Sequence, residues 1–177
     1  LIHSFYVNIY QYIKSTLRYD KKYDQNNLEN LANRFTTYYL WNYISWDYRE
    51  YVGSHPGVDI FPPKPNSEVL SVLDWEVFKA ASDDINWKHI FIKHTGVEDV
   101  ENDNKKITIY SCYLHLSELN VKTGDKVKEW DIIWKTGNTW MSYWEHLHFQ
   151  IDREEAPYHV YWPYSSTDAK KAWVTFI

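Results

Sequence analysis

"SYWEHLHFQID", residues 142–152, alternates apolar and polar side chains and carries two histidines on either side of one leucine. This period of two is typical of a β-strand, in which successive side chains point to opposite faces of a sheet. His146 and His148 are therefore expected on one face, with Leu147 on the other. Two imidazoles on one face can both reach a single metal-centred site, but such pairs also occur as ordinary polar positions on exposed strands.

Runs with the same period occur along most of the chain from about residue 41. They are rich in Ile, Val, Phe and Tyr, and they include "EVLSVLDWEVFKA" (68–80), "HIFIKHT" (89–95), "KITIYSCYLHL" (106–116) and "DIIWKTG" (131–137). Turn-forming segments separate them. "PPKPN" (62–66) is predicted to be a loop because proline cannot donate to a β-ladder, and the acidic "GVEDVENDNKK" (96–106) is predicted to be a solvated loop. The pattern predicts a mainly β domain of many short strands over residues 41–177.

Residues 1–40 differ from the rest of the chain. Apolar residues such as Leu28, Leu31 and Phe35 recur at spacings of three and four, and the segment has neither Gly nor Pro. This spacing predicts a helical N-terminal segment or linker. The simplest role for it is that of a spacer or a packing arm.

Composition narrows the class of protein. The chain has 177 residues, enough for one domain with a sizeable core, and its net charge of −5 argues against a nucleic-acid partner. No apolar run is long enough for a membrane span. The single cysteine, Cys112, excludes an intrachain disulfide, and its apolar neighbours predict a buried, inert thiol. Because the chain starts at Leu1, an upstream signal peptide or anchor could lie outside it.

Two further segments carry residues able to bind a metal. In "GSHPGVDI" (53–60), His55 and Asp59 lie on either side of a Pro-Gly turn that can bring an imidazole and a carboxylate to one point. Zinc accepts nitrogen and oxygen ligands together. In "YLHLSEL" (113–119), His115 ends a predicted strand, and taken alone it is an ordinary edge histidine.

Taken together, "HPGVD" (55–59), "YLHLSEL" (113–119), "VKTGDKV" (121–127) and "HLHFQID" (146–152) resemble the lysostaphin and LytM-type zinc endopeptidases, which cut peptidoglycan peptides. The resemblance spans roughly residues 41–165. It implies an antiparallel, barrel-sandwich-like peptidase domain of the duplicated hybrid motif type. It also implies a bacterial enzyme that acts outside the cytoplasm, in the cell envelope or after secretion.

The resemblance also implies a role for each candidate residue. His55, Asp59 and His148 are expected to ligate Zn²⁺, and His115 and His146 are expected to line the open coordination position as catalytic residues. One of these two histidines would take the proton of the attacking water and the other would steady the oxyanion. The sequence does not assign the two roles.

Other interpretations account for part of these motifs. "VKTGDKVKEWDIIW" (121–134) also resembles the hairpins of biotinyl and lipoyl carrier domains, but Met141 has no neighbouring lysine to modify. An inactive envelope protein of the same fold, which binds or regulates cell-wall hydrolases, is the main alternative.

His94 is expected to pack structurally or to support the site from behind. The sequence does not identify the peptidoglycan bond that is cut, which is either in a glycine bridge or in a direct D-alanyl cross-link. It does not identify the oligomeric state either.

Seven tryptophans occupy positions where the family pattern has glycine. They are Trp46, Trp75, Trp87, Trp130, Trp134, Trp140 and Trp144. A bulky residue at a glycine turn costs roughly 1 to 3 kcal/mol. UGA encodes tryptophan in some genetic codes and glycine in others, so these residues are hypothesised to be UGA-encoded glycines. The alternative is a lineage that has repacked its turns around aromatic side chains.

Overall fold

A computed structural model of the protein describes residues 35–37, 42–43, 53–54, 57–62, 64–83, 87–99, 105–137 and 145–153. Within these ranges the chain forms β-strands in the order β1 (Phe35–Thr37), β2 (Asn42–Tyr43), β3 (Gly53–Ser54), β4 (Val58–Ile60), β5 (Glu68–Leu70), β6 (Trp75–Asp83), β7 (Trp87–Glu98), β8 (Lys106–Leu116), β9 (Lys126–Val127), β10 (Ile132–Lys135) and β11 (Leu147–Arg153). The prediction of a mainly β domain is confirmed.

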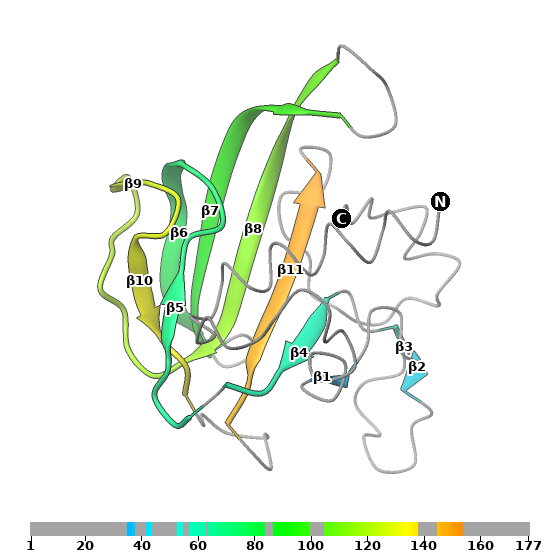
Figure 1. The fold of residues 1–177 in the computed structure, drawn as a ribbon, viewed down its shortest axis with the longest axis vertical. Helices are drawn as coiled ribbons and strands as arrows, with labels where there is room; N and C mark the ends of the chain where they lie inside the picture. The colour runs from blue at the N-terminus through cyan, green and yellow to red at the C-terminus, as the bar shows by residue number, and fades with distance from the viewer. Residues whose placement is uncertain are drawn as a thin grey trace, which may run out of the picture.

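Seven of these strands form one sheet, in the order β1-β4-β11-β8-β7-β6-β9. All of its neighbouring strands are antiparallel. Figure 1 shows β7 and β8 as long, bent neighbours, with β11 beside β8 and the short β4 beyond it. Two smaller sheets pair β5 with β10 and β2 with β3. The order places β4 and β11 side by side although they lie far apart in sequence.

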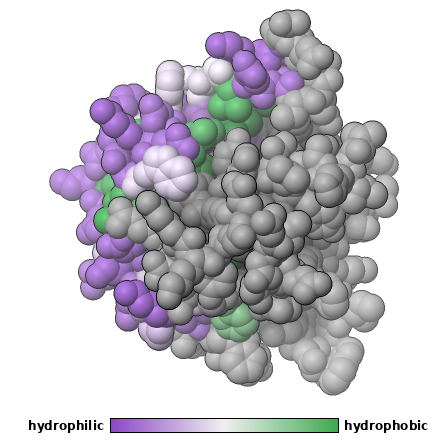
Figure 2. All heavy atoms as spheres, in the orientation of Figure 1, coloured by the Kyte–Doolittle hydropathy of each residue, from purple (hydrophilic) through white to green (hydrophobic). Residues whose placement is uncertain are grey.

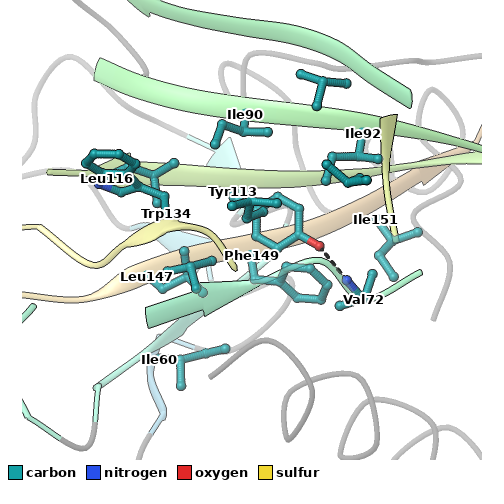
Figure 3. Close-up of a cluster of buried hydrophobic side chains, with 14 of the residues drawn as sticks. Ile60, Val72, Ile90, Ile92, Tyr113, Leu116, Trp134, Leu147, Phe149 and Ile151 are labelled. Atoms are coloured by element: carbon teal, nitrogen blue, oxygen red, sulfur yellow. Dashed lines mark hydrogen bonds between the residues drawn. The ribbon is translucent and has the colours of Figure 1, made fainter. Parts of the chain in front are cut away.

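One face of the large sheet carries the main hydrophobic core. The apolar positions of β11, Leu147, Phe149 and Ile151, point into it, as the alternation predicts. Val69 of β5 and Ile133 of β10 belong to the same cluster, so the small sheet packs on this face. Figure 3 shows the side chains of the cluster meeting from both sheets. The core therefore lies between two layers of strands.

Tyr113 places a polar group inside this core, and the group is satisfied. The backbone N–H of Val72 donates a hydrogen bond of 3.0 Å to the Tyr113 hydroxyl, drawn as the dashed line in Figure 3. Burial raises the pKa of Tyr113 well above its ordinary value. The hydroxyl thus stays neutral and ties the segment after β5 to β8.

The opposite face of the sheet has a second, smaller apolar cluster. It is made by Phe91, Tyr110, Cys112 and Leu114. Cys112 is fully buried, and burial, together with the negative charge of Asp152, raises the pKa of its thiol. The prediction of a buried thiol is confirmed.

Not every predicted segment matches the structure. The helical expectation for residues 1–40 is not confirmed, because Phe35–Thr37 form a strand that pairs with β4, and residues 1–34 lie outside the described part. The segment 62–66 contains no strand at its described positions, as expected. Residues 96–98 of the predicted acidic loop belong to β7, and residues 100–104 lie outside the described part.

The described surface is mostly hydrophilic in the view of Figure 2, with small and separate apolar areas. Among the described residues, no helix has the length and apolarity needed to cross a bilayer.

Three of the seven questioned tryptophans have described side chains, and they fall into two groups. Trp75 and Trp130 have φ angles of 145° and 74°, in the region that favours glycine, and their side chains are exposed. Trp134 is buried, and its indole Nε1 donates a hydrogen bond of 2.8 Å to the hydroxyl of Ser117. The other four, Trp46, Trp87, Trp140 and Trp144, have side chains outside the described part.

Candidate active site

Two neighbouring strands bring a carboxylate and an imidazole together. Asp59 of β4 is the register partner of His148 of β11. The Nδ1 atom of His148 lies 3.0 Å from Oδ1 of Asp59, and both side chains are buried. The same carboxylate oxygen lies 3.8 Å from Nε2 of His146. The expectation that His146 and His148 share one face is confirmed.

A β-bulge adds His115 to this group. Between the pairs Lys88↔Leu116 and Ile90↔Tyr113 the register shifts, so that β8 has one more residue than β7. His115 is at the bulge, with a φ of 64°. An extra residue reverses the side on which the following side chains point, so His115 leaves the core face that Tyr113 occupies.

The three imidazoles consequently lie close together. The ring centroid of His115 is 4.8 Å from that of His146 and 6.0 Å from that of His148. His115 and His146 are partly exposed, whereas His148 has only 1% of its surface exposed. The arrangement places one buried histidine beside Asp59 and two accessible histidines at its side.

These donors fit a zinc ion. In a tetrahedral zinc site, ligand atoms about 2.0 to 2.1 Å from the metal are roughly 3.3 Å from each other. The 3.0 Å between Asp59 Oδ1 and His148 Nδ1 is close to that separation. Among the described residues, no three His, Cys, Asp or Glu side chains are arranged so that they could together hold a metal ion. His55, the third predicted ligand, lies outside the described part, so its role stays a prediction.

Gly57 explains part of the "HPGVD" motif. A Cβ atom at this position would lie 2.4 Å from the backbone oxygen of Phe149 and 2.9 Å from Nε2 of His148. No side chain fits there without displacing β11. Glycine thus lets the residue before β4 lie directly against β11.

His94 does not join the histidines of the site. Its Nδ1 lies 2.7 Å from the backbone oxygen of Asp74, and its Nε2 lies 2.7 Å from the Ser111 hydroxyl. Burial lowers the pKa of His94 to about 4. The structure therefore supports the packing role of this neutral histidine.

Two buried residues behind His148 were not singled out from the sequence. Gln150 and Asp152 follow His148 on the same face of β11, and their exposed fractions are 4% and 1%. The alternation in "HLHFQID" already places them there. Their burial, which the sequence does not reveal, distinguishes them from ordinary polar residues on an exposed face.

A family comparison identifies the domain. The model of peptidase family M23 matches residues 53–160, which include Asp59 and all three histidines of the site. The chain belongs to peptidase family M23. The match supports the resemblance to lysostaphin and LytM-type peptidases.

Individual relatives of this M23 peptidase domain agree. Glycyl-glycine endopeptidase ALE-1 of Staphylococcus capitis is 36% identical over 98 residues, covering 55% of this chain and 24% of that protein. The catalytic domain of lysostaphin from Staphylococcus simulans is 27% identical with a TM-score of 0.52, covering 71% of this chain and 84% of that domain. A zinc-containing peptidase from Vibrio cholerae is 25% identical with a TM-score of 0.54, covering 77% of this chain and 36% of that protein. The chain spans about a quarter of the length of the curated relatives it matches.

Proposed function

We propose that this M23 domain is a zinc-dependent endopeptidase that hydrolyses peptide bonds in peptidoglycan stem peptides or cross-bridges. The observation that carries the proposal is the meeting of Asp59, His148, His146 and His115 from three neighbouring strands of one sheet. Membership of a peptidase family and the similarity to a glycyl-glycine endopeptidase support it. Since peptidoglycan lies outside the cytoplasm, the protein would act in the cell envelope or after secretion.

The buried pair of the site would hold the metal. Asp59 and His148 supply one oxygen and one nitrogen ligand, and His55 is the third ligand in this proposal. A bound zinc ion would supply a water molecule of lowered pKa and would polarise the scissile carbonyl. The burial of Asp59 and His148 favours the metal further, because a carboxylate away from water needs a positive partner.

The two accessible histidines would move the protons. Water adds to the carbonyl carbon, the C–N bond breaks, and one water proton passes through an imidazole to the leaving amine. The proposal assigns this step to His115 or His146, whose rings lie beside each other and next to the proposed ligands. The imidazole that does not carry the proton would donate a hydrogen bond to the developing oxyanion.

The test combines metal analysis with digestion of defined cell walls. The purified protein should contain about one zinc ion per chain and should release new amino termini from the walls. Walls with glycine bridges and walls with direct D-alanyl cross-links are compared to identify the bond. A chelator should abolish the release, and added zinc should restore it. Zinc binding without cleavage of either wall would instead support the inactive envelope protein.

Single substitutions separate the two classes of site residue. D59A should lose zinc, whereas H115A and H146A should keep most of the zinc and lose about 10²- to 10⁴-fold in turnover. S111A is a matched control, because it removes a buried hydrogen bond to a histidine away from the site. Full wall-lytic activity of both single variants, H115A and H146A, would contradict the assigned roles.

A further inference from the structure

A chain of hydrogen-bonded side chains runs along β11 behind the proposed zinc ligand. Nε2 of His148 lies 2.9 Å from Oε1 of Gln150, and Nε2 of Gln150 donates a hydrogen bond of 2.9 Å to Oδ2 of Asp152. All three side chains are at least nine-tenths buried. They lie on one face of the strand, two residues apart, as alternation requires.

The carboxylate at the end of this chain fixes the direction of every hydrogen bond in it. A carboxylate only accepts, so the amide NH₂ of Gln150 must face Asp152. The amide oxygen then faces His148 and also only accepts. Nε2 of His148 must therefore carry a proton. In the neutral imidazole the other nitrogen, Nδ1, is then the one that carries a lone pair.

The thiol of Cys112 strengthens this polarity. Its Sγ lies 3.7 Å from the same Asp152 oxygen that accepts from Gln150. Burial and the charge of Asp152 raise the pKa of the thiol, so it stays protonated and can donate. The thiol of Cys112 and the amide of Gln150 can thus both donate to this carboxylate oxygen, in agreement with the direction of the chain.

The far end of the chain points at Asp59. Nδ1 of His148 lies 3.0 Å from Oδ1 of that residue. Two acceptor atoms at this distance need a positive species between them, either a proton on Nδ1 that is donated to the carboxylate or a cation bound by both atoms. A cation removes the repulsion between the two acceptors, and it requires the protonation pattern that Gln150 imposes.

Gly57 lies directly against this chain of side chains. A Cβ at residue 57 would come within 2.9 Å of both Nε2 of His148 and Cβ of Gln150. Glycine at residue 57 thus lets the backbone before β4 lie directly beside these two side chains. Low local dielectric strengthens the remaining hydrogen bonds.

We propose that Gln150 and Asp152 are positioning residues that hold His148 with its proton on Nε2, leaving Nδ1 to bind zinc, and thereby set the zinc affinity of the site. The inference rests on the proposed function, since it assumes that the bound cation is zinc. Partners of this kind orient metal-bound histidines, and their loss typically costs 10- to 100-fold in metal affinity.

The experiment measures zinc affinity by competition with a chromogenic chelator. Q150L removes the acceptor and should weaken zinc binding about 10- to 100-fold relative to the unsubstituted protein. The double variant Q150E/D152N exchanges the amide and the carboxylate. Because the carboxylate introduced at position 150 still presents only acceptors to His148, and the amide introduced at position 152 can donate to that carboxylate, most of the affinity should return. S111A, which loses a hydrogen bond to His94, should bind zinc like the unsubstituted protein.

A second readout needs no substitution and no metal. Nitrogen-15 NMR of the zinc-free, unsubstituted protein should show His148 with its Nε2 protonated. The proposal would be overturned if the NMR spectrum showed His148 without a proton on Nε2. It would also be overturned if a folded Q150L variant bound zinc as tightly as the unsubstituted protein. If the unsubstituted protein binds no zinc at all, the proposed function fails, while the NMR result still decides whether Gln150 orients His148.

Discussion

Trp75 and Trp130 have backbone conformations that do not suit tryptophan. Their φ angles of 145° and 74° are disfavoured for any residue with a Cβ. The exposed fractions of their side chains are 45% and 52%, so little burial compensates for the strain. Glycine at both positions would remove the strain at small loss of packing. This is what the hypothesis of UGA-encoded glycines expects at Trp130, which lies in a turn, and at Trp75, the first residue of β6.

The backbone angles and the burial of the three described tryptophans predict the sign of three stability changes. At Trp134 the buried, hydrogen-bonded ring argues against an encoded glycine. W75G and W130G should each raise the free energy of unfolding by about 1 to 3 kcal/mol, because each removes a strained backbone conformation. W134G makes the same change at a buried ring with a hydrogen-bonded indole, and it should lower the free energy of unfolding by about 3 to 5 kcal/mol. Urea denaturation measures all three. Equal destabilisation by the three substitutions would contradict the assignment of Trp75 and Trp130 as glycine positions.

The codons give an independent test of the same residues. A UGA codon at Trp75 and Trp130, in an organism that reads UGA as glycine, would make both residues glycine in the cell. Mass spectrometry of the native protein would then show a lower mass. A UGG codon at both positions would support the alternative of turns rebuilt around aromatic side chains.

At the scale of the element, the bulge in β8 is the feature that completes the site. Simple alternation from Tyr113 would place His115 on the core face, and only the extra residue turns it towards His146. A bulge beside a functional site commonly redirects a side chain in this way. The left-handed φ of His115 is the conformational cost of the redirection.

The bulge predicts an unusual order of stability among variants at residue 115. H115G should be more stable than H115A by about 1 kcal/mol, because alanine at a φ of 64° is strained and glycine is not. In an ordinary extended strand the order is the reverse, by about 0.5 to 1 kcal/mol. Both variants lack the imidazole, so the comparison isolates the backbone. Thermal or urea denaturation gives the sign, and H115A being the more stable variant would argue against the bulge.

Much of this element-level arrangement could be predicted from the sequence. The alternation in "HLHFQID" correctly placed Leu147 in the core and His146 with His148 on the opposite face. The bulge could not be predicted, because register shifts depend on the pairing of two strands and not on one strand's pattern. The strand at Phe35–Thr37 was missed for a related reason. Its spacing suits a helix, but pairing with β4 holds it extended.

The contact between β4 and β11 is a property of the whole molecule. Asp59 and His148 are 89 residues apart in sequence, and the sheet order alone makes them neighbours. Periodicity predicts which face each side chain takes, but it contains no information on which strands pair. The family resemblance supplied that information for the site residues. The roles of Gln150 and Asp152 could be found only from the structure, because the contact of Gln150 with His148 and its hydrogen bond to Asp152 depend on burial.

The large sheet uses its two faces for different purposes. One face builds the core with the β5–β10 sheet, and the other presents Asp59 and the histidines of the site. Functional side chains on paired strands are held more rigidly than those on loops. Substitutions in the core should therefore affect stability more directly than chemistry, except where they shift β4, β8 or β11.

His94 should make the stability of the whole domain depend on pH. Its pKa is about 4 in the folded protein because it is buried, against an ordinary value of 6.5 in the unfolded chain. As the pH falls from 6.5 towards 4, the unfolded chain binds a proton that the folded protein does not. The free energy of unfolding therefore decreases across this window, by about 3 kcal/mol in total, and the loss levels off below pH 4.

Urea denaturation of the zinc-free protein at pH 7 and pH 4.5 tests this dependence. Removing zinc excludes the pH dependence of metal binding from the comparison. H94N replaces the histidine with a side chain that does not titrate, so it should lose about 2 to 3 kcal/mol less stability between the two pH values than the unsubstituted protein. S111A keeps the buried imidazole and should retain the steep dependence. If H94N and the unsubstituted protein lose stability in parallel, other groups control the acid sensitivity of the fold, and His94 packs without contributing to it.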